Sequence, residues 1–222
     1  MVTRLPTAPV ARPIGFLSDV HGNLPALDAA LAALEERDVA DVYVAGDLLL
    51  GGEDPLGVWR RLQQVDAKCV RGTSDTALIE VDPEVLKPSD DRERARAELF
   101  ARTRAEIGDL VVEQLRRLPE TLRIPLIDGS EIVVVHGSPA DPTIEITHDM
   151  SDDEVLALLA DDPADIVVCG GSHVPFERRA GDVYVVNTGT VGDNPSGERV
   201  ADFVVMTPAM DGVRVERAHV PY

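Results

Sequence analysis

The sequence predicts a layered α/β domain, and three observations lead to that prediction. Short apolar runs alternate with amphipathic segments through the first half of the chain, as strand–helix–strand units require. The second half consists mainly of strand-like runs, and Asp-Gly or Gly-Asp pairs separate several of them. The 222 residues are 44% hydrophobic and 27% charged, which suits one domain with a buried core. We therefore expect a single domain over residues 1–222.

Strands and helices alternate in the first half. Residues 14–17 form a short apolar run, and the leucines of residues 24–37 recur at helical spacing. A second strand is predicted over residues 42–45 and a third over residues 67–70. Between them a helix begins at Pro55, because proline suits the first helical position.

Two segments lie outside this alternation. Residues 1–11 contain Pro6 and Pro9, and we expect them to form a loose N-terminal leader. Residues 90–118 are dense in Arg, Glu and Ala, which predicts a helical insertion, either one long helix or two helices broken near Gly108. The charge pairs along this insertion indicate a solvated face rather than a binding site.

The second half is predicted to be richer in strands. Asp128-Gly129 is a strong hairpin signal, and Ser151 with Glu154 has the capping-box spacing of a helix start. The predicted strands are residues 121–127, 131–135, 166–169, 176–179, 183–186, 200–206 and 213–217.

The charge balance limits the partners of the protein. The formal net charge is -19, from 21 basic and 40 acidic residues, so a nucleic-acid partner is not expected. A small phosphorylated substrate remains compatible, because a bound divalent cation dominates the local field.

The cellular location is predicted from the cysteines and the apolar runs. Cys69 and Cys169 each lie in an apolar run, which favours a reducing compartment. No signal peptide and no membrane-spanning run are evident, so we expect a cytoplasmic protein without a membrane partner. A homodimer stays an open alternative.

Five polar clusters share one placement, directly after a strand-like run. In layered α/β folds ligands bind at the carboxyl ends of strands, so these clusters are expected to converge on one site. Their mixture of imidazole and carboxylate suits Mn²⁺, Fe²⁺ or Zn²⁺ better than Ca²⁺ or Mg²⁺. Each cluster alone also fits a helix cap or a core histidine, but five together favour a site. The clusters are residues 19–23, 46–47, 72–75, 136–139 and 170–173.

With these motifs the sequence resembles the calcineurin-like metallophosphoesterases, particularly the small bacterial and archaeal phosphodiesterase branch. The resemblance implies a two-sheet αββα-type sandwich flanked by helices, with a two-metal site at one edge. It rests on Ser18-Asp19-Val20-His21-Gly22-Asn23, Gly46-Asp47, Val134-Val135-His136-Gly137-Ser138-Pro139 and Val186-Asn187-Thr188-Gly189-Thr190-Val191-Gly192.

The resemblance implies a complete first metal site but an incomplete second one. The first metal takes Asp19, His21, Asp47 and His173, all of which are present. Asp47 bridges to the second metal, which His136 also binds. The family's remaining two ligands, an asparagine and a histidine, are replaced by Thr73 and Gly171. We therefore expect one firmly bound transition metal (Mn, Fe or Zn), and a second that is weak or absent.

The resemblance also implies roles in catalysis. Asp47 positions a metal-bound hydroxide, while Asn23 and His136 orient phosphate oxygens. Arg71 and Asp75 are candidate substrate-binding residues; the alternatives are a surface role for Arg71 and a helix cap for Asp75. Ser74 stands where many relatives have a general-acid histidine, and a serine is a poor proton donor.

The predicted function is a metal-dependent phosphoesterase that hydrolyses a small phosphomonoester or phosphodiester by attack of a metal-bound hydroxide. The alternative is a catalytically impaired binding or scaffold module, because the retromer scaffold subunit of this family has lost metal ligands and kept the fold. A nuclease is disfavoured by the net charge of -19 and by the absence of a basic stripe.

Overall fold

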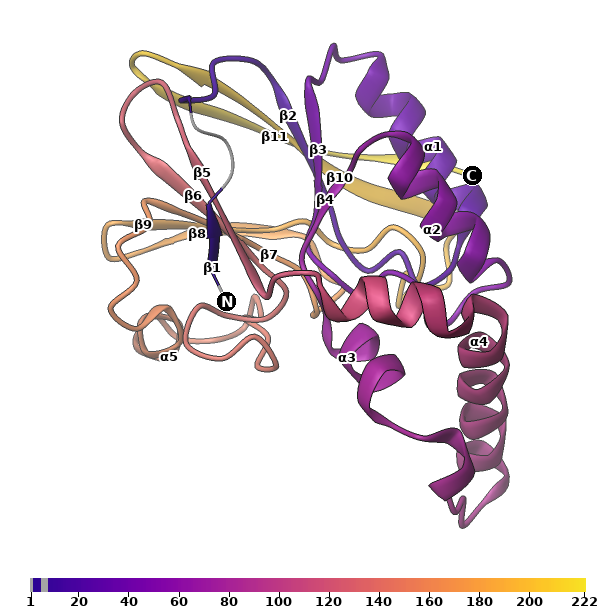
Figure 1. Cartoon of the computed structure of the whole chain (residues 1–222). Helices are drawn as coiled ribbons and strands as arrows, with labels where there is room; N and C mark the ends of the chain where they lie inside the picture. The colour runs from indigo at the N-terminus through magenta and orange to yellow at the C-terminus, as the bar shows by residue number, and fades with distance from the viewer. Residues whose placement is uncertain (1, 5–7) are drawn as a thin grey trace.

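Two β-sheets packed face to face form the centre of the molecule, and helices cover their outer faces (Figure 1). The computed structural model describes residues 2–4 and 8–222. The first sheet has six strands, in the order β1 (Val2–Arg4), β5 (Thr121–Pro125), β6 (Glu131–Val135), β7 (Ile166–Cys169), β9 (Val183–Asn187) and β8 (Phe176–Ala180).

The second sheet combines a parallel core with a long antiparallel hairpin. β2, β3 and β4 run parallel, and β10 pairs antiparallel with both β2 and β11. The final hairpin is longer than the predicted residues 200–206 and 213–217. The strand order is β11 (Gly212–Pro221), β10 (Val200–Ala209), β2 (Ile14–Leu17), β3 (Asp41–Val44) and β4 (Lys68–Cys69).

The helices form the outer layers. α1 and α2 pack on the five-stranded sheet, while α5 packs against the six-stranded sheet. The predicted αββα-type sandwich is therefore confirmed. The helices are α1 (Leu24–Glu35), α2 (Pro55–Gln64), α3 (Thr73–Glu80), the 3-10 helix η1 (Pro83–Val85), α4 (Asp91–Arg116) and α5 (Asp152–Leu159).

The core between the sheets is aliphatic with one aromatic contact. Phe16 on β2 stacks on Tyr43 of β3, with ring centroids 5.6 Å apart. Ile132, Val134 and Val168 contribute fully buried side chains from the opposite sheet. Burying a side chain of this size stabilises the fold by about 1.5–3 kcal/mol, so this layer fixes how the two sheets face each other.

The N-terminal segment differs from the prediction. Val2–Arg4 forms β1, which pairs in parallel with β5, and Val10 makes an isolated bridge to Leu126. The β-branched residues of this stretch favour an extended backbone, which can extend a sheet at its edge. The expectation of a loose leader is therefore wrong for these residues, and its positions 1 and 5–7 lie outside the described residues.

The predicted helical insertion packs on the core and breaks where expected. Gly108 has φ 67° and ψ 171°, so α4 consists of two halves that change direction sharply (Figure 1). Phe100, Ile107 and Leu115 are buried, whereas Leu110 is 74% exposed. None of the helices in the described residues is long and apolar enough to cross a membrane.

A pair of leucines on α4 tests this packing. Leu115 is fully buried in the core, so Leu115→Ala is expected to lower the free energy of unfolding by about 2–5 kcal/mol. The matched control Leu110→Ala removes an exposed side chain and is expected to change it by less than about 0.5 kcal/mol. Urea denaturation followed by circular dichroism measures both, and equal effects would contradict the packing.

Candidate metal centre

The polar clusters predicted from the sequence converge at one end of the sandwich. Asp19 and His21 follow β2, and Asp47 follows β3 in the same sheet. His136 and His173 follow β6 and β7, which are adjacent and parallel in the other sheet. The carboxyl ends of strands from both sheets therefore meet, as parallel strand order requires.

The first group of ligand atoms consists of one carboxylate and two imidazoles. His173 Nε2 lies 3.3 Å from Asp19 Oδ1, and His21 Nε2 lies 3.7 Å from the same oxygen. The two Nε2 atoms are 3.3 Å apart. Each of the three residues has one ligand atom within 4.8 Å of the other two, so all three are close enough to bind one cation.

A second group shares the centre of the site. Asp19, Asp47 and His136 bring ligand atoms within 4.8 Å of one another. Asp47 Oδ1 lies 3.5 Å from His136 Nε2, and Asp47 Oδ2 lies 3.8 Å from His21 Nε2. Asp47 thus faces both groups, which is the geometry of a bridging carboxylate.

Backbone carbonyls fix the tautomer of all three imidazoles. The Nδ1 atoms of His21, His136 and His173 lie 2.7, 2.7 and 2.9 Å from the carbonyl oxygens of Leu50, Ala45 and Asp193, respectively. Each Nδ1–H donates to its carbonyl, which leaves the Nε2 lone pair facing the centre. Metal-binding histidines are held by the same kind of second hydrogen bond.

Asp19 Oδ1 provides the test of whether this site fits a cation. The oxygen is buried and has no hydrogen-bond donor within the described residues, whereas Oδ2 accepts from the Gly171 N–H at 3.0 Å. A buried carboxylate oxygen without a donor is costly unless another positive group is present. The donor set of carboxylates and neutral imidazoles fits a divalent transition metal.

The concentration of charge at this site shifts the pKa values of Asp19 and His21 in opposite directions. Burial raises the pKa of the Asp19 carboxyl, but the neighbouring imidazoles of His173 and His21 outweigh burial and hold that pKa well below its usual range. Burial lowers the pKa of His21, but the carboxylates of Asp19 and Asp47 beside it raise that pKa to about 9. A cation must therefore compete with a proton at His21, as metal–ligand linkage predicts.

All four residues of the implied first metal set have a left-handed backbone. Their φ angles are between 48° and 58°, a region that non-glycine residues rarely adopt. Such conformations cost of order 1–3 kcal/mol each and cluster at functional sites. The four residues are Asp19, His21, Asp47 and His173.

A pocket borders the second group of ligand atoms, at Asp47 and His136. It has a volume of about 310 Å³ and is open to solvent on one side. Thr73, the first residue of α3, lines it, as expected for a residue near the second subsite. The other lining residues are Asp47, His136, Gly137, Thr143, Ile144, Glu145 and Gly171.

Three of the predicted site residues have other partners. Asn23 Oδ1 accepts from the Ala26 N–H at the start of α1, and its Nδ2 donates to the Gly192 carbonyl and the Tyr222 hydroxyl. These bonds occupy both ends of the amide, so the predicted phosphate-orienting role of Asn23 is not supported.

Arg71 and Asp75 likewise serve the fold. The Arg71 guanidinium pairs with Glu120 at 2.6 Å and does not line the pocket. The Asp75 carboxylate is fully buried and accepts from the N–H groups of Gly72 and Leu48, both at 3.0 Å. Burial and the Asp47 charge raise its pKa to about 6. Asp75 is therefore the helix cap that the alternative predicted, and it also fixes the loop after Asp47.

The sequence is consistent with this geometry. A family model for the calcineurin-like phosphoesterase superfamily domain matches residues 13–209. The chain belongs to the calcineurin-like phosphoesterase superfamily. Membership in this metal-dependent family supports a hydrolytic, phosphoesterase function.

Individual relatives are distant. The chain is 24% identical over 208 residues to an uncharacterized protein of Methanocaldococcus jannaschii, covering 86% of this chain and 81% of that protein. It resembles a hypothetical protein of Pyrococcus horikoshii, with 25% identity, a TM-score of 0.80, and coverage of 95% and 88% of the two chains. A metallophosphoesterase of Sphaerobacter thermophilus shares the fold, with 24% identity, a TM-score of 0.73, and coverage of 94% and 89%.

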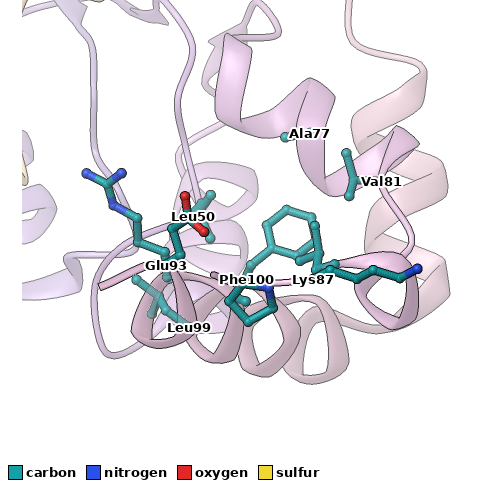
Figure 2. Close-up of a pocket in the computed structure, with 11 residues that line it drawn as sticks. Leu50, Ala77, Val81, Lys87, Glu93, Leu99 and Phe100 are labelled. Atoms are coloured by element: carbon teal, nitrogen blue, oxygen red, sulfur yellow. The ribbon is translucent and has the colours of Figure 1, made fainter. Parts of the chain in front are cut away.

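A second cavity lies beside the metal centre. The sequence patterns did not indicate it. It has a volume of about 600 Å³ between α3, η1 and the first half of α4. Figure 2 shows Leu50, Leu99 and Phe100 on one side of it, opposite Ala77 and Val81. Leu50 is also the residue whose carbonyl accepts from His21, so this cavity adjoins the first metal group.

Metal binding should be visible as a gain in stability. At a free Mn²⁺ concentration of about 100 times Kd, we expect a gain of about 2.7 kcal/mol, or about 5–11 °C in Tm for a domain of this size. The Asp19→Asn variant keeps an acceptor for the Gly171 N–H but loses the negative charge, so Mn²⁺ is expected to raise its Tm less than that of the wild type. Differential scanning fluorimetry measures both proteins with Mn²⁺ and with EDTA. Equal Mn²⁺ shifts in the two proteins would argue against a site at Asp19.

Proposed function

We propose that the protein is a metal-dependent phosphoesterase that hydrolyses a small phosphomonoester or phosphodiester. The observation that carries this proposal is the buried Asp19 Oδ1, which has no hydrogen-bond donor in the described residues and faces the Nε2 atoms of His21 and His173. Asp19, His21, Asp47 and His173 would hold one cation, and Asp47 with His136 would contribute to a second. A bound cation polarises a phosphoryl oxygen and supplies a water-derived nucleophile at neutral pH.

The chain's own residues would orient the reactants. The carbonyls of Leu50, Ala45 and Asp193 accept from the Nδ1–H groups of three imidazoles, which fixes the direction of each ring and leaves its Nε2 facing the centre. The Ser74 N–H donates to Asp47 Oδ1 at 2.8 Å and thereby orients the bridging carboxylate. The N-terminal end of α3, at Thr73, borders the same pocket and would favour a phosphate group.

Backbone strain favours the enzyme over the scaffold alternative. A scaffold has no use for four left-handed residues with their imidazoles and carboxylates aimed at one point, because glycine at these positions would relieve the strain. Strain of this kind is typical of sites where the side chain must be held in one place. Mn²⁺ is the proposed metal for a first assay, with Fe²⁺ and Zn²⁺ as alternatives.

The proposed substrate is a small phosphorylated molecule rather than a nucleic acid or a membrane. The pocket of about 310 Å³ beside Asp47 and His136 has room for a phosphate group and a modest substituent. The net charge of -19 opposes a long polyanion. Cys69 and Cys169 are buried free thiols, which supports a cytoplasmic location.

Hydrolysis of a chromogenic phosphomonoester and phosphodiester with Mn²⁺ tests the proposal. Asp47→Ala removes the carboxylate that faces both groups, and we expect it to lower kcat/KM at least about a hundredfold, or about 2.7 kcal/mol. Asp109→Ala, at a carboxylate that is 97% exposed on α4, is the matched control and should retain full activity.

The possible outcomes of this assay separate the two functions. Loss of activity in Asp47→Ala alone supports the phosphoesterase. No activity in any of the three proteins, together with no Mn²⁺ binding, would favour the scaffold function.

The leaving group provides an independent test. Ser74 is a poor proton donor, and its buried Oγ has no hydrogen-bond partner in the described residues. Departure of an alkoxide would therefore proceed without protonation by residue 74. We expect kcat to fall steeply as the pKa of the leaving phenol rises across a series of substituted phenyl phosphate esters. A flat dependence would indicate another acid in the site.

A further inference from the structure

The position of the missing second-metal histidine is bordered by a carboxylate. A Cβ atom built on Gly171 would lie 3.3 Å from Glu145 Cβ and 3.6 Å from Glu145 Oε2. The same point lies 3.6 Å from His136 Nε2. The Glu145 carboxylate and the His136 imidazole therefore approach the space beside Gly171 from two sides.

The loop that carries Glu145 is anchored on both sides of it. After His136, the Gly137 N–H donates to the Pro142 carbonyl at 3.1 Å, and the Ile144 N–H donates to the Asp141 carbonyl at 3.0 Å. Ile146 is fully buried under the sheet. Glu145 itself is exposed at the pocket wall, and its carboxylate has no hydrogen bond or ion pair with any residue in the described part of the chain.

We propose that Glu145 replaces the missing histidine and completes a second cation site with Asp47, His136 and Thr73. The proposal rests on the phosphoesterase function above and specifies how that site binds its second metal. All four residues line the same pocket. A set with two carboxylates, a hydroxyl and one imidazole is rich in oxygen, so this site is expected to prefer Mn²⁺ or Mg²⁺ over Zn²⁺.

The glycine at position 171 fits the proposed replacement of the histidine by Glu145. Gly171 has φ 76°, which a side chain strains, and a histidine there would have its Cβ 3.3 Å from Glu145. A histidine side chain at 171 would therefore crowd the Glu145 side chain. The chain provides its ligand from the loop after β6 instead of the loop after β7.

Metal stoichiometry tests the proposal without requiring hydrolysis. Isothermal titration with Mn²⁺ alone is expected to show two ions per wild-type chain. Glu145→Gln should keep the first ion with unchanged affinity and weaken the second at least about tenfold. Electron paramagnetic resonance of the doubly loaded protein should show coupled Mn²⁺ ions, and this coupling should be lost in Glu145→Gln.

Two control variants make the result specific. Glu98→Gln changes an exposed glutamate on α4 and should bind two ions like the wild type. Asp19→Asn should remove the first ion. A wild type that binds one ion at millimolar Mn²⁺, or a Glu145→Gln variant that binds the second ion with wild-type affinity, would overturn the role of Glu145. Neither result depends on activity, so failure of the hydrolase assay would remain distinguishable.

Discussion

The buried Asp19 carboxylate is the constraint on which the site depends. Its Oδ2 is bonded to the Gly171 N–H, so its Oδ1 must face the imidazoles of His21 and His173. To hold the carboxylate there, the chain turns left-handed immediately after β2 and brings the loop after β7 close to it. A Cβ atom at Gly170 would overlap Ser18 Oγ, so only glycine permits this approach. The two sheets are thereby joined at the point where charge is concentrated.

The two groups of ligand atoms differ in how the fold supports them. The first draws on the ends of β2 and β7, and backbone carbonyls hold both of its imidazoles. The second depends on the end of β6, the start of α3 and the loop that carries Glu145. Asp19 belongs to both groups, while Asp47 belongs to the second and lies 3.8 Å from His21 of the first. Asp75 holds the loop that follows Asp47. A change at Thr73 or Glu145 would therefore leave the ligands of the first group in place.

The positions of the candidate metal ligands could be predicted from the sequence, because each lies in a polar cluster that directly follows a strand. The placement of Asp19, Asp47, His136 and His173 followed from that rule, because parallel strands put their carboxyl ends at one edge. The structure gives two of the predicted site residues other partners: Asn23 caps α1, and Arg71 pairs with Glu120. Motif spacing does not show which hydrogen bonds a side chain makes once the chain is folded. Glu145 was missed because it lies in a loop, after the motif, and only the folded structure shows that it borders Gly171.

Leu50 connects two regions that otherwise have no common residue. Its carbonyl orients the His21 imidazole, while the residue also lines the apolar cavity between α3 and α4. An occupant of that cavity that shifted Leu50 would change the direction of the His21 lone pair and thus the affinity for metal. Thermodynamic reciprocity then requires that metal loading change the affinity for the occupant by the same factor. Helices α3 and α4 would in that case respond to metal loading as well as line the cavity.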